Sequence, residues 1–169
     1  MALVSVPTPP LHPRPALDRT LTLRRFAASD FATYRAWFVD GELDRRLGPI
    51  DDAWLGHVLA ERDGLQYAAL DAGRLVAVAG VLHPRPGTVW GAVTDVAVAP
   101  ARRGAGIGRR VLAALLVRPE LASVAEWRAW VEQDNHAALA MLDACGWRRA
   151  GEDDGMLEFR RARAGRPTA

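Results

Sequence analysis

The feature that most constrains this chain is a glycine-rich segment between an apolar strand pattern and an amphipathic helix pattern. Residues 94–110 read TDVAVAPARRGAGIGRR, with the strand pattern ending at Pro100 and glycines at positions 104, 106 and 108. A turn of this kind presents backbone N–H groups at the positive end of a helix, where phosphate oxygens bind. Glycine suits the turn because a Cβ would block close approach of the anion. The segment therefore predicts an anion-binding turn.

Two other interpretations of this turn stay open: a plain strand-to-helix turn with a solvated arginine rim, and a nucleotide-binding domain of another class. The Gly-x-Gly-x-x-Gly fingerprint of dinucleotide folds fails, because Arg109 stands at its last position when counted from Gly104, and Val111 when counted from Gly106. All 22 basic residues are arginine. The absence of lysine excludes a Walker-type phosphate loop and a lysine Schiff base.

Apolar periodicity on both sides of the turn predicts about seven strands and four helices. Strands are expected at 21–25, 65–70, 74–82, 89–98, 127–131, 147–150 and 156–161, and helices at 31–38, 54–59, 106–117 and 135–145. The polar segment 40–48 is also compatible with a further short helix. This alternation of elements predicts a mixed α/β domain.

Length and composition favour one domain with a core of its own. The chain has 169 residues, half apolar and a quarter charged. Residues 1–18 are rich in proline, so we expect a flexible N-terminal arm, a single domain over 19–163 and a flexible tail over 164–169. The apolar runs are far short of the ~20 residues of a membrane helix, and the N-terminus lacks a signal-peptide pattern. We expect a cytoplasmic protein that does not contact membranes.

The titratable side chains argue against several other classes of site. The single cysteine, Cys145, excludes an internal disulfide and a multi-thiolate metal site. The four histidines are scattered without ligand spacing, so no metal is expected. The net charge is +2, which gives no basic footprint for nucleic acid.

Two motifs resemble the GNAT superfamily of acyl-CoA-dependent N-acetyltransferases. Val98-Ala99-Pro100 followed by Arg103-Gly104-Ala105-Gly106-Ile107-Gly108 is similar to that family's Arg/Gln-x-x-Gly-x-Gly signature for coenzyme A. Asn135 and Ala138 followed by Gly146-Trp147 resemble its Asn-x-x-Ala and Gly-aromatic segment. The resemblance covers roughly 140 residues. It implies an α/β (α+β) fold: a mixed, mostly antiparallel sheet of six to seven strands flanked by about four helices.

The resemblance also implies the roles of particular residues. Backbone amides in the turn would hold the pyrophosphate of acetyl-CoA, with Arg103, Gly104, Ala105, Gly106, Ile107, Gly108 and Arg109 around it. The strand backbone at Val96, Ala97 and Val98 would pair with the pantetheine arm. Asn135 would contact the same arm; a helix N-cap explains its position equally well, and the two roles are compatible.

By this resemblance the chain is an N-acetyltransferase that acylates a primary amine. An amine of pKa about 10.4 is neutral in only about one molecule in a thousand at pH 7, so a base must take its proton. Asp95 is the candidate base, and a solvent-facing strand aspartate is the competing interpretation. In many members of the family a tyrosine protonates the leaving thiolate, and here its position holds Leu142. The alternative function is therefore a CoA-binding protein with impaired catalysis.

The sequence says less about the site that would bind the amine acceptor. Residues 40–52 hold five acidic residues, which could form an acidic lip that favours a cationic amine; solvated helix ends with acidic first turns explain them better. The expected partner is a small-molecule amine or the amine of a peptide or protein N-terminus. A homodimer is left open.

Overall fold

The computed structural model describes residues 21–163. The expected arms at 1–18 and 164–169 lie outside the described residues. Seven strands make one sheet: β1 (Thr22–Arg25), β2 (Gly64–Asp71), β3 (Arg74–Leu82), β4 (Trp90–Val98), β5 (Glu126–Glu132), β6 (Arg148–Asp153) and β7 (Met156–Ala162). The α-helices are α1 (Phe31–Arg35), α2 (Gly41–Leu47), α3 (Asp52–Ala60), α4 (Ile107–Leu116) and α5 (His136–Ala144).

The strand order in the sheet is β1-β2-β3-β4-β5-β7-β6. Neighbouring strands are antiparallel except β4 and β5, which run parallel and pair only over 90–92 with 126–128. Beyond Ala92 the two strands diverge. Because β4 continues to Val98 on its β3 side alone, the sheet opens between β4 and β5. This confirms the expected mixed, mostly antiparallel sheet.

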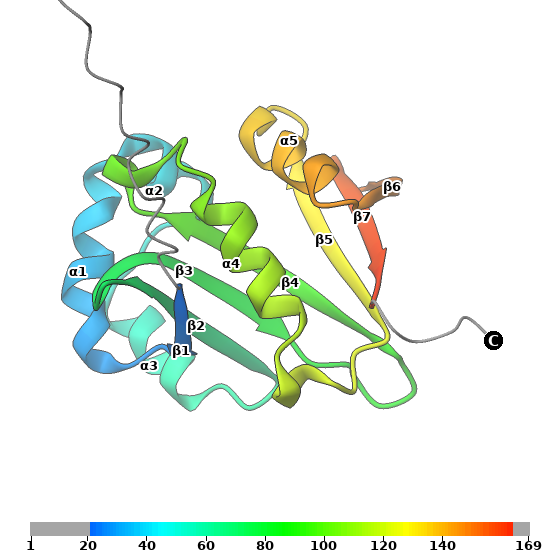
Figure 1. The fold of residues 1–169 in the computed structure, drawn as a ribbon, viewed down its shortest axis with the longest axis horizontal. Coiled ribbons are helices and arrows are strands. Elements are labelled where there is room, and N and C mark those ends of the chain that lie inside the picture. The colour runs from blue at the N-terminus through cyan, green and yellow to red at the C-terminus, as the bar shows by residue number, and fades with distance from the viewer. Residues whose placement is uncertain (1–20, 164–169) are drawn as a thin grey trace, which may run out of the picture.

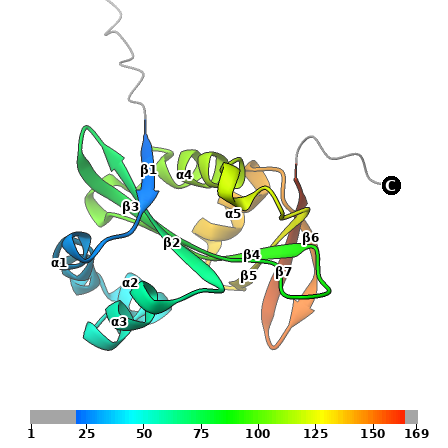
Figure 2. The same ribbon diagram turned by 90° about the horizontal axis from the view of Figure 1, so that it is seen from below.

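The helices cover the sheet in two layers, so that the molecule has three (Figures 1 and 2). Helices α4 and α5 pack on one face, and α1, α2 and α3 lie on the other. Each face has its own apolar core. The first is centred on Leu112, Leu115 and Trp127, and the second on Tyr34 and Val78. The alternation of β5, with Trp127, Ala129 and Val131 buried, places its other side chains on the face opposite α4 and α5.

The helix count differs from the expected four, because five α-helices form among residues 21–163. The optional helix at 40–48 is present as α2, which Asp40 caps by accepting from the Leu43 amide. The helix expected at 31–38 is α1 followed by a 3₁₀ turn at Ala36–Val39. A 3₁₀ turn aligns residues three apart. The ring of Tyr34 on α1 packs edge to face against two rings of this turn, Trp37 and Phe38, with centroids 5.5 and 5.1 Å apart.

We expect Leu115→Ala to lower the free energy of unfolding by about 3 kcal/mol. Leu115 is fully buried between α4 and the sheet, so truncation leaves a cavity that the close-packed core fills only in part. Urea unfolding followed by circular dichroism measures the change. Val117→Ala is the control: Val117 is 68% exposed, so its truncation should change the stability by less than about 0.5 kcal/mol. Equal losses in both variants would contradict this packing.

Candidate active site

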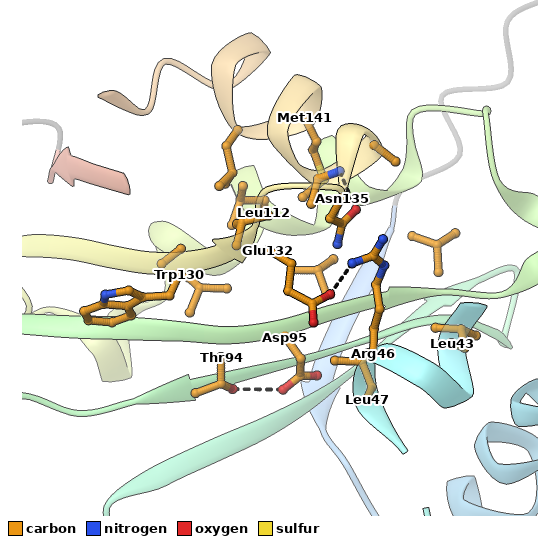
Figure 3. A pocket seen from close by; sticks show the side chains of 18 of the residues that line it. Leu43, Arg46, Leu47, Thr94, Asp95, Leu112, Trp130, Glu132, Asn135 and Met141 are labelled. Atoms are coloured by element: carbon orange, nitrogen blue, oxygen red, sulfur yellow. Dashed lines mark hydrogen bonds and ion pairs between the residues drawn. The ribbon is translucent and has the colours of Figure 1, made fainter. Parts of the chain in front are cut away.

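A cavity of about 410 Å³ occupies the opening between β4 and β5 (Figure 3). Its walls come from β4, β5, α2, α4 and α5. The polar side chains that line it are Glu42, Arg46, Thr94, Asp95, Arg103, Glu132 and Asn135; the apolar ones include Leu43, Leu47, Trp130, Met141, Leu142 and Met156. Since the strands separate here, the cavity lies in the plane of the sheet and meets both helical layers.

The glycine-rich turn lies between the end of β4 and the start of α4. Gly104 and Gly106 have φ angles of +75° and +72°, in the left-handed region that glycine adopts without strain. A Cβ at either position would point into open space, so the turn has room on its outer side. No side chain caps the N-terminus of α4. Its first N–H groups, which have no acceptor within the helix, are therefore available to an anion.

Gly108 has a different role from the other two glycines of the turn. A Cβ there would lie 2.8 Å from the sulfur of Met141, so glycine allows α4 to approach α5 closely.

Arg103 lines the cavity, and its guanidinium is bound by both carboxylate oxygens of Asp40 at 3.0 Å. This pair ties the turn to the start of α2.

Asn135 caps α5, since its Oδ1 accepts from the Ala138 amide at 3.1 Å, and it also lines the cavity. The cap and a contact with a bound molecule are thus compatible.

Arg109 does not line the cavity. It lies in a shallow depression beside Gly106, together with Arg110, Cys145 and Arg161.

Asp95 is half-buried and lines the cavity from β4, the central strand of the sheet, beyond the residues at which β4 pairs with β5. Its Oδ1 accepts from the hydroxyl of Thr94 and its Oδ2 from Nε2 of Gln66, both at 2.8 Å. Burial raises the pKa of the Asp95 carboxyl, and hydrogen bonds from Thr94, Gln66 and the Gly80 backbone act in the opposite direction. A carboxyl with a raised pKa is a stronger base than an exposed one.

No tyrosine lines the cavity. Leu142, at the position where the family resemblance implies a tyrosine, is buried and forms part of the wall. Burial, with a smaller contribution from the charge of Asp95, raises the pKa of Tyr34 far above its usual value. Burial and the carboxylate of Glu120 raise the pKa of Tyr67 to about 12, and its hydroxyl donates to Glu120 at 3.1 Å. Both phenols stay protonated at neutral pH, and neither lies at the cavity wall.

Two of the five acidic residues at 40–52 cap helices. Asp40 caps α2, and Asp51 caps α3 by accepting from the Trp54 amide. Of the five acids in this segment only Glu42 lines the cavity. Helix capping thus accounts for two of the five acids, and a continuous acidic lip does not form.

Arginines of α2 form ion pairs across the opening of the sheet. Arg46, only 12% exposed, pairs with Glu132 at the end of β5 (Figure 3). It also pairs with Glu42 on its own helix and with Asp134 at 3.1 Å. Arg45 reaches Asp134 at 3.2 Å. These contacts join the two halves of the sheet where the strands themselves are unpaired.

Sequence reasoning assigned no role to several side chains at the cavity or next to it: Arg46, Gln66, Thr94, Trp130, Glu132 and Met156. Two signals were present. Gln66 is a polar residue inside the apolar strand 65–70, and Gly80 interrupts the apolar strand 74–82. A glycine inside a strand often marks close approach of another group. Nothing in the sequence pairs Arg46 with Glu132, which is 86 residues away.

The described residues hold neither a membrane span nor a cluster of metal ligands. None of the helices within residues 21–163 combines the length and apolar character needed to cross a bilayer. Over the same residues no three His, Cys, Asp or Glu side chains gather into a group that could hold a metal ion.

Comparison with known proteins identifies the family of the chain. A family model described as Acetyltransferase (GNAT) family matches residues 23–147. The phosphinothricin N-acetyltransferase of Alcaligenes faecalis is 31% identical over 118 residues, which are 66% of this chain and 54% of that protein. The chain thus spans about half the length of this relative.

Solved structures share the fold. An acetyltransferase from Thermus thermophilus matches with a TM-score of 0.72 at 18% identity, over 85% of this chain and 97% of that one. Spermidine N-acetyltransferase from Vibrio cholerae, in complex with CoA and spermine, matches with a TM-score of 0.71 at 13% identity, over 85% and 96% of the two chains. The family model matches residues 23–147, which are well over half of this chain. The chain therefore belongs to the GNAT family of acetyltransferases.

Proposed function

We propose that this protein is an N-acetyltransferase that moves the acetyl group of acetyl-CoA to a primary amine of a small molecule or of a peptide or protein N-terminus. The observation that carries the proposal is the position of Asp95. Its carboxylate lines a cavity between two diverging strands, and Arg103 of the glycine-rich turn lines the same cavity. The uncapped N-terminus of α4 follows this turn. A base close to an anion-binding turn is what acyl transfer from acetyl-CoA requires.

The residues present fit acetyl-CoA, which would supply an activated thioester when bound. The uncapped amides at the start of α4 and the open space outside Gly104 and Gly106 suit a pyrophosphate. Arg103 and Arg109 add positive charge on either side of the turn. From Val96 to Val98 the β4 backbone pairs with β3 alone, so its other edge is available to an extended arm, and Asn135 faces that gap. The depression around Arg109 offers a second cationic surface next to the turn.

In the proposed reaction Asp95 takes a proton from the ammonium form of the acceptor, directly or through water. The neutral nitrogen then attacks the acetyl carbonyl carbon and gives its second proton to water, the C–S bond breaks, and the thiolate leaves. Leu142 cannot protonate it, so the thiolate takes a proton from water. A thiol of pKa about 8.5 is a tolerable leaving group without an acid. Deprotonation of the amine, and not thiolate loss, then limits the rate.

The acceptor would enter from the α2 face, where Leu43, Leu47, Trp130 and Met156 give apolar walls. The carboxylates of Glu42 and Glu132 are both bound by Arg46, so the cavity offers less free negative charge than its composition suggests. Similarity to enzymes named for phosphinothricin and spermidine supports a small amine as acceptor. The second candidate, a CoA-binding protein with impaired catalysis, is favoured by Leu142 alone.

We expect thiol release from acetyl-CoA when the protein is given a panel of amines: polyamines, amino acids, aminoglycosides and short peptides with free N-termini. The supporting result is amine-dependent thiol release with N-acetylated product in the mass spectrum. Binding of acetyl-CoA in calorimetry without turnover on any amine would favour the impaired protein. Product that is only O- or S-acetylated would contradict an amine acceptor.

We expect Gly106→Val to weaken binding of acetyl-CoA by on the order of tenfold or more, which is about 1.4 kcal/mol. A β-branched residue is strained at φ +72°, and its side chain fills the space in which the pyrophosphate would lie. Isothermal titration calorimetry measures the affinity. Gly73→Val is the control, because Gly73 has a φ of +76° in the β2–β3 turn, away from the cavity. Equal affinities in a folded Gly106→Val protein would overturn the assignment.

We expect Asp95→Asn to lower kcat/KM by roughly 10²- to 10⁴-fold, the usual effect of removing a general base. In the wild type kcat/KM should rise with pH as Asp95 ionises, over a range above that of an ordinary aspartate, because burial raises its pKa. No fall should follow at higher pH, since no side-chain acid is essential. Leu142→Tyr should change the rate little. A falling limb that disappears in Tyr34→Phe or Tyr67→Phe would show that a tyrosine is the acid.

A further inference from the structure

Three side-chain positions stand in a row across the sheet beneath the cavity. Gln66 on β2 lies directly opposite Gly80 on β3, and Gly80 lies directly opposite Asp95 on β4. Neighbouring strands are about 4.8 Å apart, so the backbones of β2 and β4 are separated by roughly 9.6 Å. Side chains on these two strands can meet only if the residue between them leaves the space free.

Gly80 leaves that space free. A Cβ at position 80 would lie 2.7 Å from Oε1 of Gln66, and closer still to Oδ1 of Asp95 and Oγ1 of Thr94. Real Cβ atoms do not approach other atoms so closely, so any side chain here would displace all three groups. Gly80 is buried in the middle of β3 and is not among the residues with positive φ. Glycine is therefore required at this position for space and not for backbone conformation.

A β-bulge supplies the third member of the group. The register between β3 and β4 shifts at this point: Gly80 faces Asp95, Val81 faces Val93, and Thr94 is the extra residue. Bulges redirect side chains, and they are common next to active sites. Here the Thr94 hydroxyl donates to Oδ1 of Asp95, while Nε2 of Gln66 donates to Oδ2. Each carboxylate oxygen therefore has its own donor.

We propose that Gln66 is a positioning residue, which acts through Asp95 by holding its carboxylate oriented and ionised at the cavity wall. Gly80 provides the space for this contact. An ionised carboxylate only accepts hydrogen bonds, so the Gln66 amide must present its NH₂ group to it. Gln66 does not itself line the cavity. The inference rests on the proposed role of Asp95 as base.

Gln66 is uncharged, but several titratable and charged groups lie around Asp95. The phenol of Tyr34 on α1 interacts electrostatically with Asp95. Glu42 and Arg46 from α2, and Glu132 from β5, line the same cavity. Arg46 is bound by acidic partners on three sides, and no direct pair between it and Asp95 forms. Substituting Gln66 leaves these groups in place, so a change in the ionisation of Asp95 can be assigned to the lost donor.

The test compares the wild type with Gln66→Met, which keeps the length of the side chain and removes both donors. The carboxyl pKa of Asp95 is measured by carbon NMR titration, with the signal assigned by its absence in Asp95→Asn. A lost hydrogen bond disfavours the charged form, so the pKa of Asp95 should rise by about one unit. The rising limb of kcat/KM should move to higher pH by the same amount, with the KM for acetyl-CoA unchanged.

Two further variants complete the test. Gln66→Glu places a second carboxyl beside Asp95 at nearly constant volume; like charges disfavour double ionisation, so the apparent pKa of Asp95 should rise here too, even if Gln66→Met does not fold. Gly64→Ala is the control for strain in the sheet. Its Cβ would lie 2.7 Å from the Val81 carbonyl oxygen, and Asp95 is not among its nearest neighbours. It should lower the melting temperature without moving the carboxyl pKa.

An Asp95 pKa that is the same in the wild type, Gln66→Met and Gln66→Glu would overturn the proposal. So would a carboxyl pKa that moves while the pH profile of kcat/KM stays in place, because Gln66 would then have no part in the reaction. The NMR titration needs no turnover. If the protein acetylated no amine, the proposed function would fail while the carbon titration still decided whether Gln66 controls the carboxylate.

Discussion

The short parallel pairing between β4 and β5 is the constraint on which the rest of the structure depends. Only residues 90–92 and 126–128 join the two strands, and beyond them the sheet opens. A continuous sheet would separate the two helical layers completely. Because this one divides, residues of α2 on one face, and of α4, α5 and the turn (Arg103) on the other, line one cavity. A thioester held by the turn and an amine on the α2 face could then meet within the sheet.

The cost of an opened sheet is unpaired backbone along the β4 edge and weaker contact between the two halves. Other contacts compensate. Arg45 and Arg46 bind Glu132 and Asp134 across the opening, and Arg103 binds Asp40 from the turn. Gly108 lets α4 and α5 pack closely on the opposite face. Three of these residues, Arg46, Arg103 and Glu132, also line the cavity, so stability and site geometry are coupled here.

Much of this fold follows from the order of the residues. The strand 74–82 matches β3 fully, and the other strands agree within a few residues. Periodicity sufficed because each strand or helix has a continuous apolar face that must be buried. Residues 31–38 were less predictable. Their closely spaced aromatics fit a helix, but packing against one another and against Trp54 favours a short helix with a tightened last turn.

The sequence by itself determined the glycine-rich turn, the apolar strands around it and the family, since these depend on residues close together in the chain. It also indicated Asp95, which lies near the end of β4, and Asn135, which lies at the start of α5. Only the tertiary structure decided what surrounds them. The contact of Gln66 with Asp95 depends on the register of three strands, on a one-residue bulge and on the missing side chain of Gly80. The pairing of Arg46 with Glu132 joins residues 86 positions apart. Such contacts arise from how elements pack. The sequence marks Gln66 and Gly80 as unusual within their strands, but it does not show which residues they contact.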